Sequence, residues 1–290
     1  MEEIYIKARA KVNLSLEVLG KREDNYHNLE SVFQKINLYD EIYIKKIQEK
    51  DFRLKINVKE LDSKENIIYK AYGKLKEQYK VINGIEVIVN KKIPMQAGMA
   101  GGSTDCAAFI IAMNKLFKLE LSKKEMEALG KSLGADVVPC FYNKAIKAEG
   151  IGDMITTIDT DFKYYMVIIK PEIACNTKEM YQKLDTEKDI QQLHTSENII
   201  KALENKDIQL LTNNLYNVFE EVVQEKQSIQ EIKKELLNNG ALQALMTGSG
   251  SCVYGIFKDK QSAKNAYITL KERYQTYICT SYNMKKGEMF

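Results

Sequence analysis

The chain has 290 residues, 44% of them hydrophobic and 29% charged, which is typical of a globular protein with a sizeable core. Its 43 Lys and Arg exceed its 40 Asp and Glu by only three, so the charge gives no support for nucleic acid as a partner. The longest uninterrupted apolar run, Cys106 to Met113, is far shorter than the roughly 20 residues of a membrane-spanning helix, so no membrane span is expected.

The five cysteines are widely spaced and form no Cys-x-x-Cys pair, which argues against both a disulfide framework and a zinc site. We expect free thiols that are mostly core residues; for Cys106 we favour a buried helix position over a reactive thiol. The first residues have neither a basic nor an apolar segment of the kind found in export signals, so we expect a cytoplasmic protein. Whether it is a monomer or a homodimer stays open.

The first third of the chain is rich in predicted strands. Residues 12–18 alternate between apolar and polar side chains, which predicts a half-buried strand with Lys11 and Asn13 on the same non-core face. Strands of the same kind are expected at 41–46, 52–59 and 85–90, in an antiparallel arrangement.

Helical periodicity follows at 66–80, 104–117 and 123–133, and the last of these helices begins with a Ser122 to Glu125 capping box. After a strand at 164–169, we expect helices at 176–184, 196–205, 207–224, 227–239 and 262–274, and strands at 242–247, 252–257 and 276–284. The pattern changes near 155–160. We therefore expect an α+β protein of two closely packed lobes, residues 1–157 and 158–290.

A glycine-containing loop, Pro94 to Asp105, lies between a predicted strand and an apolar helix. Glycines allow the backbone to approach a ligand closely, and a helix N-terminus offers unpaired N–H groups, so the loop is a candidate phosphate cradle. The alternative is an ordinary turn with Ser103, Thr104 or Asp105 as the N-cap. The loop has neither the Gly-Lys-Ser/Thr of a Walker A motif nor a Gly-x-Gly-x-x-Gly fingerprint.

Four further features could carry chemistry, and each also has an ordinary explanation. Lys11 could be a solvated strand residue, and Asp136, after Gly134, could be a turn or cap residue. Residues 246–251, Met-Thr-Gly-Ser-Gly-Ser, could admit a ligand or only make a tight turn. Tyr26 and His27 occur in a polar stretch where a histidine is exposed by default, while His194 suggests no function.

Together, in this order, the motifs resemble those of the GHMP kinases. The resemblance covers about residues 7–257, from Ala10-Lys11-Val12-Asn13 and Tyr26-His27 through Asn66-Ile-Ile and the glycine loop to Gly134-Ala-Asp136 and Thr247-Gly-Ser-Gly. Among the members of the family, it is most similar to a kinase of the non-mevalonate route to isoprenoid precursors. The fold that it implies has an N-terminal lobe like domain 2 of ribosomal protein S5 and a ferredoxin-like C-terminal lobe.

The resemblance implies ATP as the phosphoryl donor, with Mg²⁺, and a small substrate that carries a cytidine diphosphate group and a tertiary hydroxyl as acceptor. Lys11 and Asp136 match the catalytic pair of the family. The nucleotide-binding positions are matched by Asn66, Pro94, Met95, Gln96, Ala97, Gly98, Met99, Ala100, Gly101, Gly102, Ser103 and Thr104. Those for the cytidyl substrate are matched by Asn13, Tyr26 and His27, and Tyr181 is the candidate for stacking on the cytosine ring.

Three details of the loops complete the comparison with the family. Residues 248–250 match the motif that supports the glycine loop, and Ser103 or Thr104 is the candidate hydroxyl ligand of Mg²⁺. Gln96 and Ala100 stand where many members have glycine, and Ser251-Cys252 replaces a common Pro-Thr. Alanine is acceptable at position 100 only if φ there is negative, so the departure puts the shape of the loop in question, but not its role.

Overall fold

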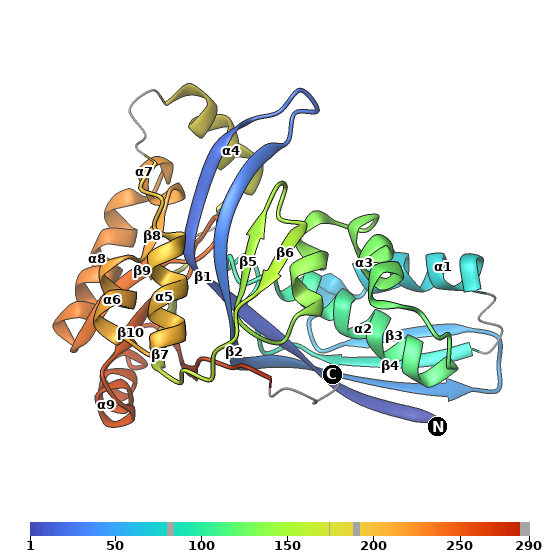
Figure 1. Cartoon of the computed structure of the whole chain (residues 1–290). Helices are drawn as coiled ribbons and strands as arrows, with labels where there is room; N and C mark the ends of the chain where they lie inside the picture. Colours follow the sequence, from blue (N-terminus) through green and yellow to red (C-terminus); the bar gives the residue numbers. More distant parts are fainter. Residues whose placement is uncertain (80–83, 174, 188–191, 285–290) are drawn as a thin grey trace.

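Two β-sheets form the frame of the molecule (Figure 1). The computed structural model describes residues 1–79, 84–173, 175–187 and 192–284. Within these ranges, the first sheet has the strand order β3-β4-β2-β1-β8, and β5 and β6 extend it from β2. Its strands are β1 (Glu3–Lys21), β2 (His27–Ile47), β3 (Phe52–Ile56), β4 (Gly84–Asn90), β5 (Ile146–Glu149), β6 (Met154–Thr157) and β8 (Tyr216–Asn217).

The helices of the first half cover one face of the first sheet (Figure 1). They are α1 (Ile67–Tyr79), α2 (Gly101–Phe117) and α3 (Lys123–Lys131), with the short 3-10 segments η1 (Lys59–Leu61) and η2 (Ala135–Phe141). The apolar run Cys106 to Met113 forms the middle of α2 and is entirely buried, which explains why it is hydrophobic on all sides. The capping box at Ser122 and Glu125 begins α3 as predicted.

The second sheet is antiparallel throughout, with the strand order β11-β7-β10-β9. Its strands are β7 (Tyr165–Lys170), β9 (Ala241–Met246), β10 (Val253–Phe257) and β11 (Gln275–Thr280). The helices of this half are α4 (Thr177–Thr186), α5 (Ser196–Asn205), α6 (Ile208–Asn213), α7 (Phe219–Val222), α8 (Lys226–Asn238) and α9 (Lys260–Leu270). The α+β arrangement in two closely packed lobes agrees with the prediction.

Each face of the second sheet has its own core. Val167 and Ile169 pack with residues of α8 and α9, while Met166 and Ile168 pack with α5 and with β1. Because β1 of the first sheet takes part in the second of these cores, the two sheets are joined by a continuous apolar interior.

The strand predicted at 12–18 is part of β1, but the prediction that it is half-buried is wrong, because both faces of this part of β1 are buried. Val12 and Leu14 lie in the shared core, and the polar face is covered by the segment that leads into α5. Ser15 is hydrogen-bonded to Ser196 (Oγ–Oγ 2.9 Å), and the Glu17 carboxylate accepts the backbone N–H groups of His194 and Thr195 at 3.0 Å each. Polar residues on a buried face are tolerated here because they are hydrogen-bonded.

The antiparallel prediction for the first third fails at one pair of strands. β3 and β4 run parallel, with Phe52 beside Ile85, because α1 connects them as a crossover helix. Residue 80, the predicted end of that helix, lies outside the described residues. The first half of β2 and the strands β5 and β6 were not predicted. The last helix, predicted at 262–274, is α9 and ends at Leu270.

The predicted helix 207–224 is interrupted between α6 and α7. Tyr216 and Asn217 form β8 beside Ser15 and Leu16 of β1. The Asn217 side-chain amide donates hydrogen bonds to the backbone oxygens of Met246 (2.7 Å) and Gly248 (2.8 Å). Tertiary hydrogen bonds thus override the helical periodicity of the segment.

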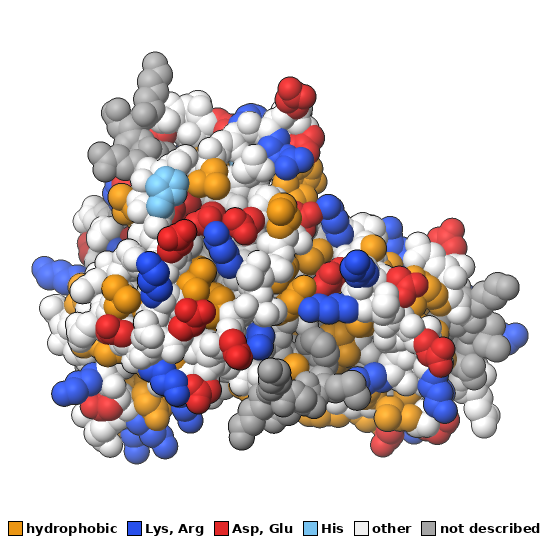
Figure 2. All heavy atoms as spheres, in the orientation of Figure 1, with side chains coloured by type: hydrophobic (Ala, Val, Ile, Leu, Met, Phe, Trp, Pro, Cys, Tyr) orange, Lys and Arg blue, Asp and Glu red, His pale blue; other side chains and the backbone are white. Residues whose placement is uncertain are grey.

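The charges on the surface and the state of the cysteines agree with the predictions made from the composition. Figure 2 shows acidic and basic side chains interspersed over the visible face, without a large area of one sign. All five cysteines are free; Cys175 is half-buried and the other four, Cys106 included, are buried. Among the described helices, none is both long and apolar enough to cross a membrane.

Candidate active site

A cavity of about 870 Å³ opens between the two halves of the molecule. Lys11 and Asn13 of β1 line it together with Asp136 of η2. The glycine loop lines it from Pro94 to Ser103, and residues 248–250 line it from the second half. Motifs that lie far apart in the sequence therefore meet around one space.

Gly98 fixes the shape of the glycine loop. Its φ is +68°, and a Cβ at this position would lie 1.9 Å from the backbone oxygen of Thr247. A Cβ on Gly248, whose φ is +56°, would in turn lie 2.7 Å from the backbone oxygen of Gly98. The two loops are thus in backbone contact, as expected if residues 248–250 support the glycine loop.

Ala100 and Gln96 both adopt a positive φ, of +56° and +49°. A negative φ, which would leave alanine at position 100 unstrained, is therefore not found. The backbone has the left-handed conformation that glycine favours, and the alanine side chain is strained there. Ala100 is the N-cap of α2, and no side chain caps this end of the helix. The alternative with Ser103, Thr104 or Asp105 as N-cap is wrong, because all three lie inside the helix. The first N–H groups of α2 remain available to an anion.

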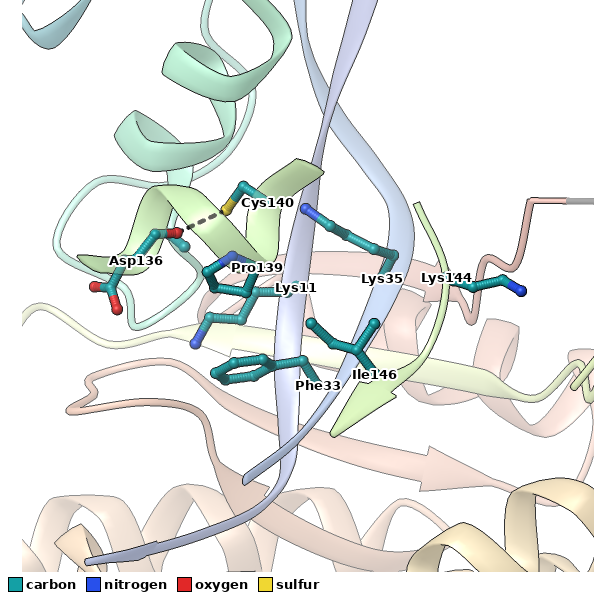
Figure 3. Close-up of a pocket in the computed structure, with 9 residues that line it drawn as sticks. Lys11, Phe33, Lys35, Asp136, Pro139, Cys140, Lys144 and Ile146 are labelled. Atoms are coloured by element: carbon teal, nitrogen blue, oxygen red, sulfur yellow. Dashed lines mark hydrogen bonds between the residues drawn. The ribbon is translucent and has the colours of Figure 1, made fainter. Parts of the chain in front are cut away.

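Lys11 reaches the base of the cavity from β1. Its ammonium donates to Asn13 Oδ1 (2.5 Å) and to the backbone oxygen of Gly98 (2.9 Å). Burial lowers the pKa of Lys11 to about 8, while the nearby Asp136 carboxylate acts in the opposite direction. Figure 3 draws a small pocket that shares Lys11 and Asp136 with the cavity, and in it the Lys11 and exposed Asp136 side chains extend to the same side.

Asn13 is buried, and both polar atoms of its side chain are hydrogen-bonded. The amide oxygen accepts from Lys11, and the amide nitrogen donates to Ser31 Oγ at 2.9 Å. Its backbone N–H donates to Thr247 Oγ1 at 3.1 Å. Asn13 therefore joins Lys11 to the loop of the second half.

Lys35 is a buried lysine that the sequence reasoning missed. It lies opposite Lys11 on β2, and its ammonium donates to the Arg9 backbone oxygen (3.0 Å) and to Thr104 Oγ1 (3.2 Å). Burial lowers its pKa. Thr104 also donates to the Arg9 backbone oxygen at 2.7 Å and is absent from the cavity wall, so only Ser103 of the two predicted hydroxyls lines the cavity.

A buried ionic cluster at the start of the loop was also missed. The Lys91 ammonium lies between the carboxylates of Asp40 and Asp105, 2.6 Å from the latter. Asp40 accepts the backbone N–H groups of Lys92 (2.5 Å) and Ile93 (2.8 Å), and thereby anchors the strand end from which the loop departs. These residues are ordinary charged residues in the sequence, and only the tertiary structure buries them.

Asn66 lines the cavity directly before α1, and both polar groups of its side chain bond to nearby backbone. Its amide nitrogen donates to the backbone oxygen of Leu61, and its amide oxygen accepts from the N–H of Ile68, both at 2.9 Å. Asn66 lines the same cavity as the glycine loop and caps the start of α1, while its predicted contact with ATP stays a prediction.

The predicted substrate-binding residues divide into two groups. His27 begins β2, and its ring stacks on Tyr181 (centroids 4.7 Å apart, planes at 21°), so the expectation of an exposed loop histidine is wrong. Tyr181 lines the cavity and meets Phe219 edge-on. A base hydrogen-bonded in the plane of the imidazole would lie on the same side of Tyr181 as His27. Tyr26 is 56% exposed and lines a separate hollow with Arg22 and Lys131.

Residues 66–144 match the family model of the GHMP kinases N terminal domain, and residues 199–276 match that of the GHMP kinases C terminal. The chain therefore belongs to the GHMP kinases and is a phosphotransferase. Within this class, it is 40% identical over 287 residues to the 4-diphosphocytidyl-2-C-methyl-D-erythritol kinase of Alkaliphilus oremlandii, with 98% of each chain covered. A second relative of that name, from Clostridium tetani, is 41% identical over 94% of this chain and 98% of its own.

The solved structures agree with these sequence relatives. A crystal structure of 4-(cytidine 5'-diphospho)-2C-methyl-D-erythritol kinase superposes with a TM-score of 0.84 at 26% identity, covering 97% of this chain and 100% of the other. A mevalonate kinase from L. major shares the fold at 16% identity, with a TM-score of 0.78 and 98% of each chain covered. By sequence and structure, the chain falls with the 4-diphosphocytidyl-2-C-methyl-D-erythritol kinases among the GHMP kinases.

Proposed function

We propose that this kinase transfers the γ-phosphoryl group of ATP to the C2 hydroxyl of 4-diphosphocytidyl-2-C-methyl-D-erythritol. The products are the 2-phosphate and ADP, in the non-mevalonate route to isoprenoid precursors. The observation that carries the proposal is that Lys11, Asp136, the glycine loop and Tyr181 all line the same cavity. The curated relatives that are about 40% identical over nearly the whole chain carry the name of that kinase.

The glycine loop and the N-terminus of α2 would hold the ATP phosphates. The uncapped N–H groups and the positive end of the helix dipole attract negative charge without a net basic surface. The cavity wall also fits Mg²⁺, because the Ser103 hydroxyl offers the kind of oxygen ligand that this ion prefers, and it needs few protein ligands when phosphates and water supply the rest. When bound, Mg²⁺ would neutralise charge on the phosphates.

Asp136 would accept the proton of the C2 hydroxyl or orient that hydroxyl for attack. Its carboxylate is exposed to the cavity, as a group that meets a substrate must be. Lys11 would stabilise the negative charge that develops near the transferred phosphoryl group. General-base assistance of this kind typically contributes about 10²–10⁴ to the rate.

Asn13, Tyr26, His27 and Tyr181 would bind the cytidine diphosphate end of the substrate. Asn13 and Tyr181 line the same cavity as Lys11, and His27 stacks on Tyr181. Tyr26 would reach the base only from the adjoining hollow.

The experiment that tests this function is an ADP-release assay with four acceptors side by side: 4-diphosphocytidyl-2-C-methyl-D-erythritol, mevalonate, homoserine and galactose. We expect release of ADP with the first acceptor only. Release with another acceptor would favour a different small-molecule GHMP kinase. No release with any acceptor, together with retained binding of ATP, would favour a catalytically silent ligand-sensing relative.

We also propose a lobe boundary after residue 157 and a cytoplasmic location. β6 ends at Thr157, and β7, the first strand of the second sheet, begins at Tyr165. The five free thiols suit a reducing compartment.

A further inference from the structure

We propose that Asp185 is a positioning residue for the substrate: it holds the imidazole of His27 in one orientation and one tautomer, so that the ring distinguishes cytosine from uracil. The inference rests on the proposed function, because it assumes that the substrate carries a cytidine base. It adds a residue that neither the motifs nor the relatives' names identify.

Helix α4 contacts His27 at two points. Tyr181 stacks on the imidazole ring, and the Asp185 carboxylate lies 2.6 Å from Nε2. Residues four apart on a helix lie on the same face, so one turn of α4 supplies both contacts. Stacking fixes the plane of the ring, and the hydrogen bond fixes its rotation within that plane.

Asp185 is itself fixed by a second partner. Lys21, at the end of β1, lies 2.6 Å from its other oxygen and is paired with His27 across the two strands. The hydrogen bonds from His27 and Lys21 lower the pKa of Asp185, so it remains an ionised carboxylate. Two side chains of α4 therefore hold the imidazole of His27, of which only 9% is exposed, and Lys21 of β1 holds Asp185 in turn.

A neutral imidazole has one nitrogen that donates a hydrogen bond and one that accepts. An ionised carboxylate only accepts, so Nε2 must carry the hydrogen and Nδ1 becomes the acceptor. Within the described part of the chain, no hydrogen bond to Nδ1 is formed. The ring thus presents an unused acceptor whose direction is set by α4.

This acceptor suits the amino group of cytosine. Uracil has a carbonyl oxygen at the same position, and two acceptors facing each other would leave both without a hydrogen. A site built to bond a donor discriminates strongly against an analogue that lacks it, because its polar group is then left unpaired. Asp185 would therefore contribute to the choice of base without touching it.

The tautomer can be measured directly, because the chain contains only two histidines, His27 and His194. Long-range ¹H–¹⁵N spectra at alkaline pH, where imidazoles are neutral, would show two ring systems, and His194→Gln assigns them. We expect the Nε2–H form for His27 in the wild type and a mixture of both tautomers in Asp185→Ala. The Nδ1–H form in the wild type, or an unchanged His27 spectrum in Asp185→Ala, would overturn the proposal.

Kinetics then test the consequence for recognition. In Asp185→Ala we expect the KM for the cytidyl substrate to rise about tenfold, and its preference over the uridine analogue to fall about tenfold, since one uncharged hydrogen-bonding contact commonly has this size of effect. The kcat and the KM for ATP should stay within about twofold, which a general loss of structure would not allow. Asp185→Glu, which keeps a carboxylate, should restore much of the preference.

Lys21→Gln is the matched control, because it removes the other partner of Asp185 and leaves the bond to His27. It should keep the wild-type tautomer and most of the preference for cytidine. An equal preference in Asp185→Ala and in the wild type would refute the role of Asp185. If the wild-type enzyme does not phosphorylate the cytidyl substrate at all, the proposed function fails and the base-recognition role fails with it, while the spectra still decide whether Asp185 sets the tautomer.

Discussion

Lys11 on β1 and Lys35 on β2 are directly paired across the two strands, so two ammonium groups of the same sign lie beside the proposed site of phosphoryl transfer. Lys11 has the Asp136 carboxylate nearby, whereas Lys35 bonds only to a backbone oxygen and a hydroxyl among the described residues. Both lysines line a small pocket together with Asp136, so positive charge is concentrated next to this carboxylate although the whole chain is nearly neutral.

We expect kcat/KM to fall as the pH rises through about 8. Burial lowers the pKa of Lys11 to about 8, so the ammonium that attracts the phosphates is lost above this pH and present below it. The measurement is a pH profile of kcat/KM in the wild type and in Lys11→Arg. Arginine does not deprotonate in this range, so any activity that remains in the variant should lack the alkaline fall. A wild-type profile that stays flat well above pH 8 would contradict the assignment.

Lys35→Met should stabilise the fold by about 1 kcal/mol or more at neutral pH. Burial lowers the pKa of Lys35, so keeping its ammonium charged in the folded state costs free energy that an apolar side chain of similar size avoids. Urea unfolding at neutral pH measures the change. The matched control is Lys147→Met, which removes a lysine bonded to Glu30 and Glu149 and should not stabilise. The alkaline limb of kcat/KM should also move to higher pH, since Lys35 contributes to lowering the pKa of Lys11.

Asp136→Asn should lower kcat by at least about 10² and leave the KM values for ATP and the cytidyl substrate within a few-fold. The amide keeps the size of the side chain but can neither take the proton nor carry the negative charge. Steady-state kinetics with both substrates varied provide the test. Asp161→Asn, at an exposed residue paired with Lys206, is the control and should have wild-type kinetics. Near-normal turnover in Asp136→Asn would remove Asp136 from the catalytic role.

Gly98→Ala should destabilise the protein by at least about 3 kcal/mol and abolish ATP binding, because the added Cβ would lie 1.9 Å from the Thr247 backbone oxygen. Gly73→Ala, in the exposed middle of α1, is the matched control: nothing lies within 4 Å of its Cβ, and a gain of about 1 kcal/mol is expected from helix propensity. Thermal unfolding and ATP titration of both variants test the contrast. Equal stability of the two would show that the loops are not in tight contact.

Ala100→Gly should raise the free energy of unfolding by up to about 1 kcal/mol. Alanine at φ +56° pays about 1–2 kcal/mol for a left-handed backbone, and glycine loses about 0.4–1 kcal/mol through the extra freedom of its unfolded chain. Chemical denaturation of the variant and the wild type measures the difference. A clear loss of stability would mean that the backbone at Ala100 is unstrained.

The elements that the sequence predicted well are those with local signals. The capping box of α3 needs only Ser122 and Glu125, and α2 is marked by its own apolar run. The first half of β2 contains many polar residues, and β5 and β6, of four residues each, are too short to show a clear alternation of apolar and polar residues. These strands form because they pair with strands that are distant in the sequence. Asn217 breaks a predicted helix for the same reason, since its partners are backbone oxygens about thirty residues away.

For the site, the sequence motifs predicted several residues that line the cavity, but not the buried residues that fix their positions. Lys11, Asp136 and the glycine loop carry recognisable motifs and do meet around one cavity. Lys35 and Asp185 have no motif, and in the sequence they are indistinguishable from solvated surface charges. Their roles depend on burial and on neighbours from other elements, which a local pattern does not contain.

The length of β1 has a consequence for any attempt to divide the molecule. This one strand of 19 residues contributes Ala8 to the core under α2, Val12 to the core shared with the second sheet, and Leu16 to the core under α8. A fragment ending at residue 157 would expose the last two contacts, and the complementary fragment would lose its packing partner. The two halves, divided after residue 157, are therefore expected to be unfolded as separate polypeptides and to regain kinase activity only by fragment complementation.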